Sequence, residues 1–167
     1  SVGIYLMSNL TDLISAGGSP SFPTIFLSKS QTWVPPQDGN IMIHVIGAGG
    51  SGATSAGNNA TAGAAGGYCK KNTLAVTTSG SFTIVVGAGG SRVSGDTSGN
   101  AGGNSTVAGT GLSSTLTANG GARGVTSSYA DVAGGSASGG DVNNTGGKAY
   151  YVDNGYSGGG AVGLAGT

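Results

Sequence analysis

The position of the glycines constrains this chain more than any motif does. Of 37 glycines in 167 residues, only four precede Gly47, and the other 33 lie from there to the end. A glycine inside a helix or strand costs roughly 0.5–1 kcal/mol relative to alanine. Placing 33 in regular elements would cost on the order of 15–30 kcal/mol, more than the stability of a typical domain. The body of the chain must therefore make use of the missing side chains.

So much glycine is also typical of disorder, but the charge is not. Six basic and six acidic residues cancel, only 7 % of the residues are charged, and there is no glutamate. Disordered chains usually carry a high net charge, whereas a neutral chain collapses or aggregates unless it folds. We therefore expect a folded protein of one domain with at most a small appendage.

One arrangement that exploits missing side chains is the lateral packing of polyproline II-type backbone. This helix has three residues per turn and no internal hydrogen bonds, so its N–H and C=O groups bond to neighbouring helices. Gly160, Gly163 and Gly166 keep the three-residue register, but most other glycines do not. The sequence therefore favours polyglycine II-type segments without establishing a regular array.

The first 46 residues are ordinary in composition. Ile4, Met7, Leu10, Leu13 and Ile14 recur at helical spacing before Gly17-Gly18, which predicts a short amphipathic helix over residues 4–16. Strands are predicted in three apolar stretches, with a turn at residues 36–39 between the last two: Phe22–Leu27, Thr32–Pro35 and Ile41–Ile46.

The body then repeats itself. The strand and glycine run of residues 44–51 return as residues 84–91. Between them, residues 68–76 and 81–86 alternate well enough to predict a hairpin that turns at residues 78–80. The fold class expected is mainly β and irregular: a short N-terminal helix, a small antiparallel β-sheet, and a glycine-rich body with polyglycine II-type packed segments and surface loops.

Residues 47–52 match the GxGxxG pattern of dinucleotide sites directly after a strand. Such a site needs the loop to open a helix and an acidic residue about 20 positions on. Residues 53–67 have no helical periodicity, and Cys69, Lys70 and Lys71 stand where the acid should be. We interpret the match as a product of composition.

Other chemistry also lacks candidates. His44 is the only histidine and alternates with Met42 and Ile46, which indicates a partly buried structural residue. No second histidine, cysteine pair or glutamate completes a metal site or catalytic triad, so we expect no enzyme, cofactor or metal. Cys69 is the only cysteine and can form no internal disulfide. Six scattered Lys and Arg residues argue against nucleic acid, and neither a signal peptide nor an apolar membrane span is evident.

The aromatic residues are more suggestive. Four of the six tyrosines lie in the last third, in polar stretches between glycine segments. Exposed tyrosine supplies rigid amphipathic contact area and stacks on sugars or protein surfaces. Alternatively, the rings fold back to cap a small core. The four are Tyr129, Tyr150, Tyr151 and Tyr156.

The order of these pieces resembles the glycine-rich domain of tailed-bacteriophage tail proteins. The resemblance covers about residues 30–125 and rests on six pieces in sequence: TWVP at 32–35, GAGG at 47–50, GGYCKK at 66–71, VVGAGG at 85–90, GGNST at 102–106 and TLTANGG at 115–121. Within that group the chain is similar to the small adhesins at the tips of long tail fibres. This sequence departs from the pattern of those adhesins because it has fewer long runs of glycine.

The resemblance implies a non-enzymatic virion protein that binds a host receptor. Residues 1–30 would attach to another tail protein or oligomerise, and residues 31–167 would form the glycine-rich domain whose variable loops contact a host surface protein or glycan. It points to Tyr129, Tyr150, Tyr151, Asp153, Asn154 and Tyr156 as receptor-binding residues, with no cofactor and with a homo-oligomer left open. The protein would be made in the host cytoplasm without a signal peptide and end in the phage tail or spike. Two alternatives are a structural tail protein without receptor binding and an ice-binding glycine-rich protein.

Overall fold

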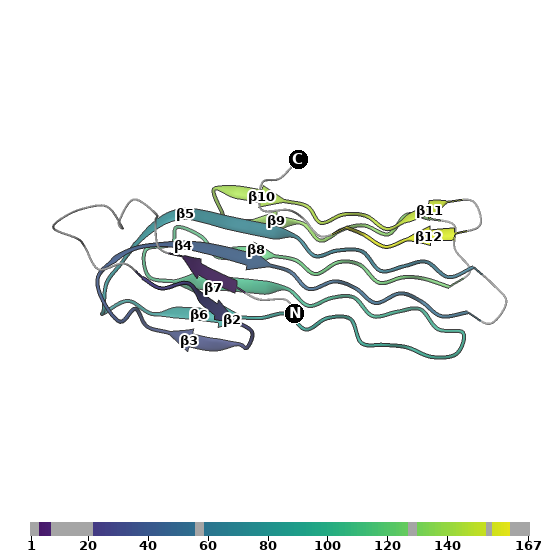
Figure 1. Ribbon diagram of the computed structural model, residues 1–167, viewed down its shortest axis with the longest axis horizontal. Coiled ribbons are helices and arrows are strands. Elements are labelled where there is room, and N and C mark those ends of the chain that lie inside the picture. The colour runs from purple at the N-terminus through teal and green to yellow at the C-terminus, as the bar shows by residue number, and fades with distance from the viewer. Residues whose placement is uncertain (1–3, 8–21, 56–58, 127–129, 153–154, 161–167) are drawn as a thin grey trace.

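A computed structural model describes residues 4–7, 22–55, 59–126, 130–152 and 155–160 (Figure 1). These residues form strands and no helix. The strands are β1 (Ile4–Met7), β2 (Ile25–Leu27), β3 (Gln31–Trp33), β4 (Gly39–Ile46), β5 (Tyr68–Val76), β6 (Phe82–Val85), β7 (Ser105–Gly109), β8 (Leu116–Ala118), β9 (Ala137–Ser138), β10 (Val142–Asn144), β11 (Tyr150–Val152) and β12 (Gly155–Ser157).

The strands build two five-stranded sheets and one two-stranded hairpin. One sheet has the order β10-β5-β4-β1-β2, the other has the order β3-β6-β7-β8-β9, and β11 pairs with β12. Every pairing between these strands is antiparallel. The expectation of a mainly β protein with antiparallel sheets is therefore confirmed.

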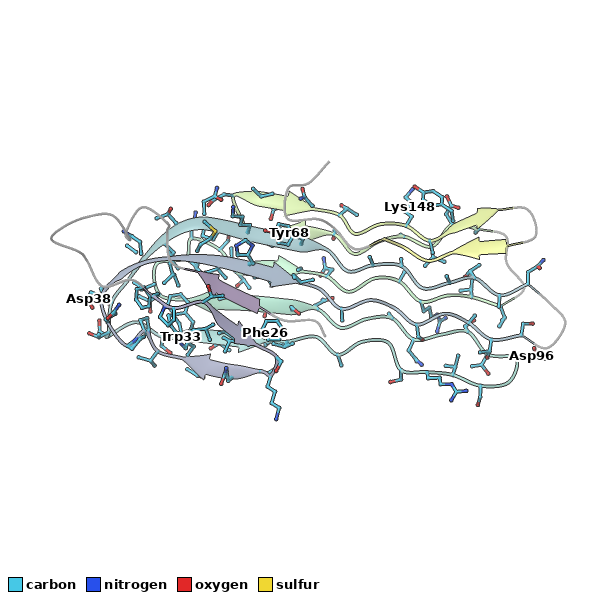
Figure 2. All side chains as sticks on the ribbon, in the orientation of Figure 1. Phe26, Trp33, Asp38, Tyr68, Asp96 and Lys148 are labelled. Atoms are coloured by element: carbon cyan, nitrogen blue, oxygen red, sulfur yellow. The ribbon has the colours of Figure 1, made fainter. Side chains whose placement is uncertain are left out.

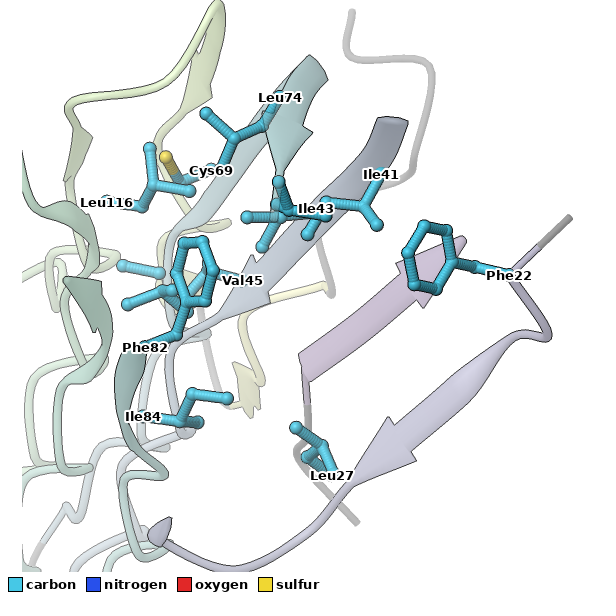
Figure 3. Packing of buried hydrophobic residues seen from close by; sticks show 13 residues of the cluster. Phe22, Leu27, Ile41, Ile43, Val45, Cys69, Leu74, Phe82, Ile84 and Leu116 are labelled. Atoms are coloured by element: carbon cyan, nitrogen blue, oxygen red, sulfur yellow. The ribbon is translucent and has the colours of Figure 1, made fainter. Parts of the chain in front are cut away.

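The two larger sheets pack face to face over one hydrophobic core, seen from close by in Figure 3. On β4, Ile41, Ile43 and Val45 are at most 1 % exposed. From the opposite sheet, Phe82 and Ile84 of β6 are each 1 % exposed. Because alternate residues of a strand point to one face, this period of two gives each sheet one apolar face, and the two faces bury each other.

Beyond the sheets, the paired strands continue as glycine-rich segments that run side by side away from the sandwich (Figure 1). We call these segments the glycine bundle. It comprises residues 47–54, 61–67, 86–91, 99–104, 119–126, 132–136, 145–149 and 158–160.

The register of the strands passes unbroken into the bundle. Strands β4 and β5 pair Ile46 with Tyr68, and the same register continues in hydrogen bonds from an amide to a carbonyl. These bonds are Gly47 to Gly67 (2.9 Å), Gly50 to Ala64 (3.0 Å) and Ala53 to Thr61 (3.0 Å). Strands β7 and β8 continue likewise, through Gly102 to Gly121 (3.0 Å) and Gly99 to Gly124 (2.9 Å). Hydrogen bonds now recur every three residues, which is the period of a polyproline II helix.

In the bundle, segments from opposite sheets also bond to each other. The continuation of β4 donates to that of β7 in three bonds: Ala48 to Gly103 (3.1 Å), Ser51 to Asn100 (2.9 Å) and Thr54 to Thr97 (3.0 Å). The continuation of β5 donates to that of β8 in three more: Gly67 to Asn119 (2.8 Å), Ala64 to Ala122 (3.0 Å) and Thr61 to Val125 (3.0 Å). The two layers of the sandwich thus merge into one hydrogen-bonded bundle.

Glycine is what permits this merger. A Cβ atom on Gly47 would lie 2.1 Å from the Asn119 carbonyl oxygen, and one on Gly120 would lie 2.0 Å from the Gly102 carbonyl oxygen. Stacked sheets normally stay about 10 Å apart because side chains fill the space between them. Where glycine removes those side chains, the backbones approach to hydrogen-bonding distance.

The prediction of an N-terminal helix over residues 4–16 is wrong where the structure can test it. Ile4–Met7 form strand β1, which lies between β2 and β4 in the first sheet. Residues 8–16 lie outside the described residues. A short isolated helix is marginal, and pairing with two neighbouring strands outweighs the local helical spacing.

The predicted hairpin of residues 68–76 and 81–86 is half right. Both strands form, and the Gly80 amide donates to the Thr77 carbonyl at 2.8 Å in the turn between them. However, β5 pairs with β4 and β10, whereas β6 pairs with β3 and β7. The turn therefore carries the chain from one sheet to the other, because Leu74 and Ile84 both have to reach the core between the sheets.

Candidate functional site

The end of the glycine bundle far from the sandwich is the candidate functional site, and we call it the distal end. The chain turns back there between residues 54 and 61, 91 and 99, 126 and 132, and 149 and 158 (Figure 1). Isolated antiparallel bridges tie neighbouring turns together: Thr54 with Thr97, Ala60 with Thr126, and Val132 with Ala149. The polar stretches that separate the glycine segments thus come from distant positions of the sequence to one end.

Three of the six predicted binding residues lie together in the β11–β12 hairpin at this end. The register places Tyr150 opposite Ser157 and Tyr151 opposite Tyr156. Tyr150 is 53 % exposed, one of the large apolar or aromatic residues that remain open to solvent. Tyr129, Asp153 and Asn154 lie outside the described residues, so the structure does not place them.

A second feature of the distal end was not among the predicted site residues. Residues 91–100 form a loop that packs against residues 51–54 and borders an open surface hollow of about 500 Å³ lined in part by Arg92 and Ser94. Figure 2 shows Asp96 of this loop at the tip of the bundle, on the opposite side from the β11–β12 hairpin. The only sequence feature that marked it was a lone arginine in a stretch of serine, threonine and glycine.

In the sandwich, large aromatic side chains pack against one another. Phe22, Trp33 and Phe82 form a contact series, with ring centroids 6.5 Å apart for Phe22 and Trp33 and 5.7 Å apart for Trp33 and Phe82. Figure 2 places Trp33 and Tyr68 in this half of the molecule. The alternative in which the last tyrosines cap a core does not fit Tyr150, because its ring is half exposed at the far end.

His44, which the sequence indicated as a partly buried structural residue, is buried in the sandwich. It is 5 % exposed, and its Nδ1 atom lies 2.6 Å from the hydroxyl oxygen of Tyr68, which is 1 % exposed. Burial, together with the positive charge of Lys70, lowers the pKa of His44 below its ordinary value of 6.5. Its Nε2 atom is buried without a hydrogen-bond partner in the structure. The neutral ring is therefore the form that the fold favours.

The residues of the GxGxxG pattern form part of the glycine bundle. The amides of Gly47 and Gly50 donate to carbonyls of the neighbouring segment, so they are not free to bind a pyrophosphate. No helix follows the loop in the described part of the chain. The described residues therefore do not form the strand–loop–helix unit that a dinucleotide site needs.

Other reactive groups are also engaged or enclosed. The Cys69 thiol is fully buried and donates to the Ser138 carbonyl at 3.2 Å, and burial raises its pKa. On the surface, Asp141 accepts from Lys71 Nζ and from the Asn72 amide, both at 2.7 Å, and these bonds lower its pKa. Within the described ranges, no three His, Cys or Asp side chains are grouped to hold a metal ion. The same residues contain no helix long and apolar enough to cross a membrane.

Comparison with known protein families identifies the family of this chain. A family model described as a glycine-rich domain matches residues 26–167. Searches of curated proteins and of solved structures returned no match. The matched region includes all but the first residue of β2, the strands β3 to β12 and every segment of the glycine bundle. Because the match spans most of the sequence, this chain belongs to the glycine-rich domain family.

Proposed function

We propose that this protein is a non-enzymatic receptor-binding adhesin of a bacteriophage tail fibre or spike. One observation carries the proposal: the glycine bundle brings four turns from distant parts of the chain to one end, and the β11–β12 hairpin with the exposed Tyr150 stands among them. A rigid scaffold that displays variable loops at a tip is a common design for recognition. The resemblance of the sequence to tail-fibre tip adhesins supports the same assignment.

We infer that the segments of the bundle are polyglycine II helices. Hydrogen bonds between segments recur every three residues, and glycines stand where a Cβ atom would collide with a neighbouring backbone. Gly160 is part of this system, because its carbonyl accepts from the Gly147 amide at 3.3 Å. Such a bundle is a stiff spacer, since each segment is braced by several neighbours. It would hold the receptor-binding turns away from the rest of the particle.

The sandwich is the end that we assign to attachment on another tail protein. Among the described residues, strand β2 stands at the edge of the first sheet, and the Phe26 side chain is 43 % exposed. An exposed aromatic side chain offers apolar area to a partner protein. The sandwich therefore faces the virion in this proposal, and the distal end faces the host surface, which carries a protein or glycan receptor.

Binding of the purified protein to bacterial cells tests the proposal. Fluorescently labelled protein is incubated with a panel of strains, and the strains that bind it are infected in the presence of an excess of unlabelled protein. We expect saturable binding and protection from infection. Absence of binding to every strain, or binding without protection, would leave a structural tail protein as the better assignment.

A pair of variants tests the placement of the site. The double variant Tyr150→Ala, Tyr151→Ala removes two rings of the distal hairpin, and we expect it to abolish binding while the thermal unfolding transition stays unchanged. The matched control is Phe26→Ala, which removes an exposed aromatic ring at the sandwich end and should bind cells normally. Equal binding by the double variant and the wild type would exclude the hairpin from the site.

A further inference from the structure

The hollow at the distal end is an open surface depression whose lining includes several hydrogen-bonding groups. Its volume of about 500 Å³ lies in the range of ligand pockets. One wall comes from the glycine bundle and the other from the loop that follows residue 90. The lining consists of hydroxyl groups, one guanidinium, one small apolar side chain and glycine backbone: Ser51, Thr54, Arg92, Val93 and Ser94, with Gly52, Gly90 and Gly95.

The loop that carries Arg92 is held in place by bonds at its neck and along its length. At the neck, Asn100 Nδ2 donates to the Ser91 carbonyl at 3.1 Å, and the Asn100 amide donates to Ser51 Oγ at 2.8 Å. Further along, Thr97 Oγ1 donates to the Ser94 carbonyl at 3.2 Å, and Thr54 Oγ1 donates to the Gly95 carbonyl. A loop ordered in advance loses little entropy when a ligand binds.

Glycine fits this loop to the bundle at two points. Gly95 has a φ of 75°, a left-handed conformation that side chains rarely adopt. A Cβ atom on Gly90 would lie 2.1 Å from the Asn100 carbonyl oxygen and 2.4 Å from the Ser51 nitrogen. The second glycine lets the base of the loop lie directly on residue 51, and this close approach gives the hollow its floor.

The Arg92 side chain forms no ion pair or hydrogen bond with another described residue. Among the described residues the salt bridge is that of Lys71 with Asp141, and Arg92 is neither part of it nor bonded elsewhere. Arginine offers five N–H donors in a planar fork that matches a carboxylate or a phosphate. Ser51, Thr54 and Ser94, which carry hydroxyl groups, line the same hollow as Arg92. No aromatic ring lines it, so recognition would rest on charge and hydrogen bonds.

We propose that this hollow binds an acidic saccharide. The anionic group, a carboxylate or phosphate on a sugar, would pair with Arg92, and the sugar hydroxyls would exchange hydrogen bonds with the serine and threonine hydroxyls and the glycine backbone. The proposal rests on the adhesin function, because it names the receptor chemistry that one side of the distal end would recognise. It adds a polar site to the aromatic hairpin on the opposite side.

Titration of the isotope-labelled protein, followed by NMR, tests this site with defined probes. Glucuronate and glucose 6-phosphate should shift the amide signals of residues 90–95. Neutral glucose and inorganic phosphate should bind at least about tenfold more weakly, since one lacks the charge and the other lacks the sugar hydroxyls. Equal shifts with glucose would overturn the role of charge. Equal affinity for inorganic phosphate would reduce the site to an adventitious ion only.

Three variants make the test specific to the hollow. Arg92→Ala should weaken glucuronate binding by about tenfold or more, and Ser94→Glu should weaken it as strongly because it adds a negative charge at the rim. Arg123→Ala removes another exposed arginine of the bundle outside the hollow and should bind as the wild type does. Unchanged binding by Arg92→Ala would overturn the proposal. Cell attachment is measured separately, so a protein that binds glucuronate but no cells would contradict the adhesin function and not this site.

Discussion

The Gly47 amide donates to the Gly67 carbonyl at 2.9 Å, directly after Ile46 and Tyr68 close the last pair of β4 and β5. The bond keeps the register of the strands but begins a ladder with a period of three residues instead of two. The change in period occurs where large side chains give way to glycine and other small residues. Up to Ile46 and from Tyr68 the strands have side chains that hold the sheets apart, and beyond them glycine and alanine let the sheets merge.

The bundle should be intolerant of a methyl group at its contact points. A Cβ atom on Gly121 would lie 2.0 Å from the Ala64 carbonyl oxygen, so we expect Gly121→Ala to lower the free energy of unfolding by about 1–3 kcal/mol or more. Gly89 is the matched control, because a Cβ atom there meets nothing within 4 Å. Gly89→Ala should leave stability unchanged or raise it by up to about 1 kcal/mol. Equal destabilisation in denaturant titrations of the two variants would contradict the close packing.

Stability should fall as the pH drops below 6.5. The folded protein lowers the pKa of His44, so the unfolded chain binds more protons, and acid favours unfolding between pH 6.5 and the lowered pKa. Protonation would also place a second positive charge beside Lys70, the cross-strand partner of His44, in a buried pair with Tyr68. Denaturant titrations at several pH values measure this loss. In His44→Phe the dependence on pH in this window should vanish, and a wild type with flat stability there would refute the assignment.

A second loss of stability is expected at lower pH. The bonds from Lys71 and the Asn72 amide lower the pKa of Asp141 below 3.8, so their contribution is present above 3.8 and is lost as the pH falls through the folded value. The pair is partly exposed, and Asp141→Asn should cost less than about 1 kcal/mol at neutral pH. Added salt should reduce that cost. A cost that is large and insensitive to salt would mean that Asp141 does more than clamp the start of β10 to β5.

Cys69 should be inert in the folded protein. Its thiol is buried and hydrogen-bonded to Ser138, and the raised pKa keeps it protonated. Because the thiolate is the nucleophile, alkylation should proceed only through unfolding. Reaction with iodoacetamide should therefore be slow in buffer and rapid in denaturant. Comparable rates in the two conditions would show that β5 opens readily at this position.

The sequence by itself determined the central strands of the sandwich, β4, β5 and β6, and the character of the body. The alternation of Ile41, Ile43 and Val45, and of Phe82 and Ile84, predicts strands with one buried face, and these residues do line the core. The glycine excess after Gly47 predicts backbone-to-backbone packing. The interpretations of His44 and of the GxGxxG match could also be made from neighbouring residues, because both depend on local context.

For the candidate site, the sequence indicated that polar stretches between glycine segments are displayed. It marked the tyrosines of the hairpin because residue type alone singles them out. Arg92 was missed, since its significance depends on Ser51 and Thr54, which lie some forty residues earlier and approach only when the segments pack.

Only the tertiary structure decided which segments are neighbours. Local spacing in residues 4–7 favours a helix, but β1 gains two pairing partners by extending, and the turn after Val76 leads to the opposite sheet because Leu74 and Ile84 share one core. Which strands pair depends on the contacts on both sides of each strand. Apolar residues at every second position show only that one face of a strand is apolar. Which apolar faces meet, and which glycine segments then converge, depends on contacts between residues far apart in the chain.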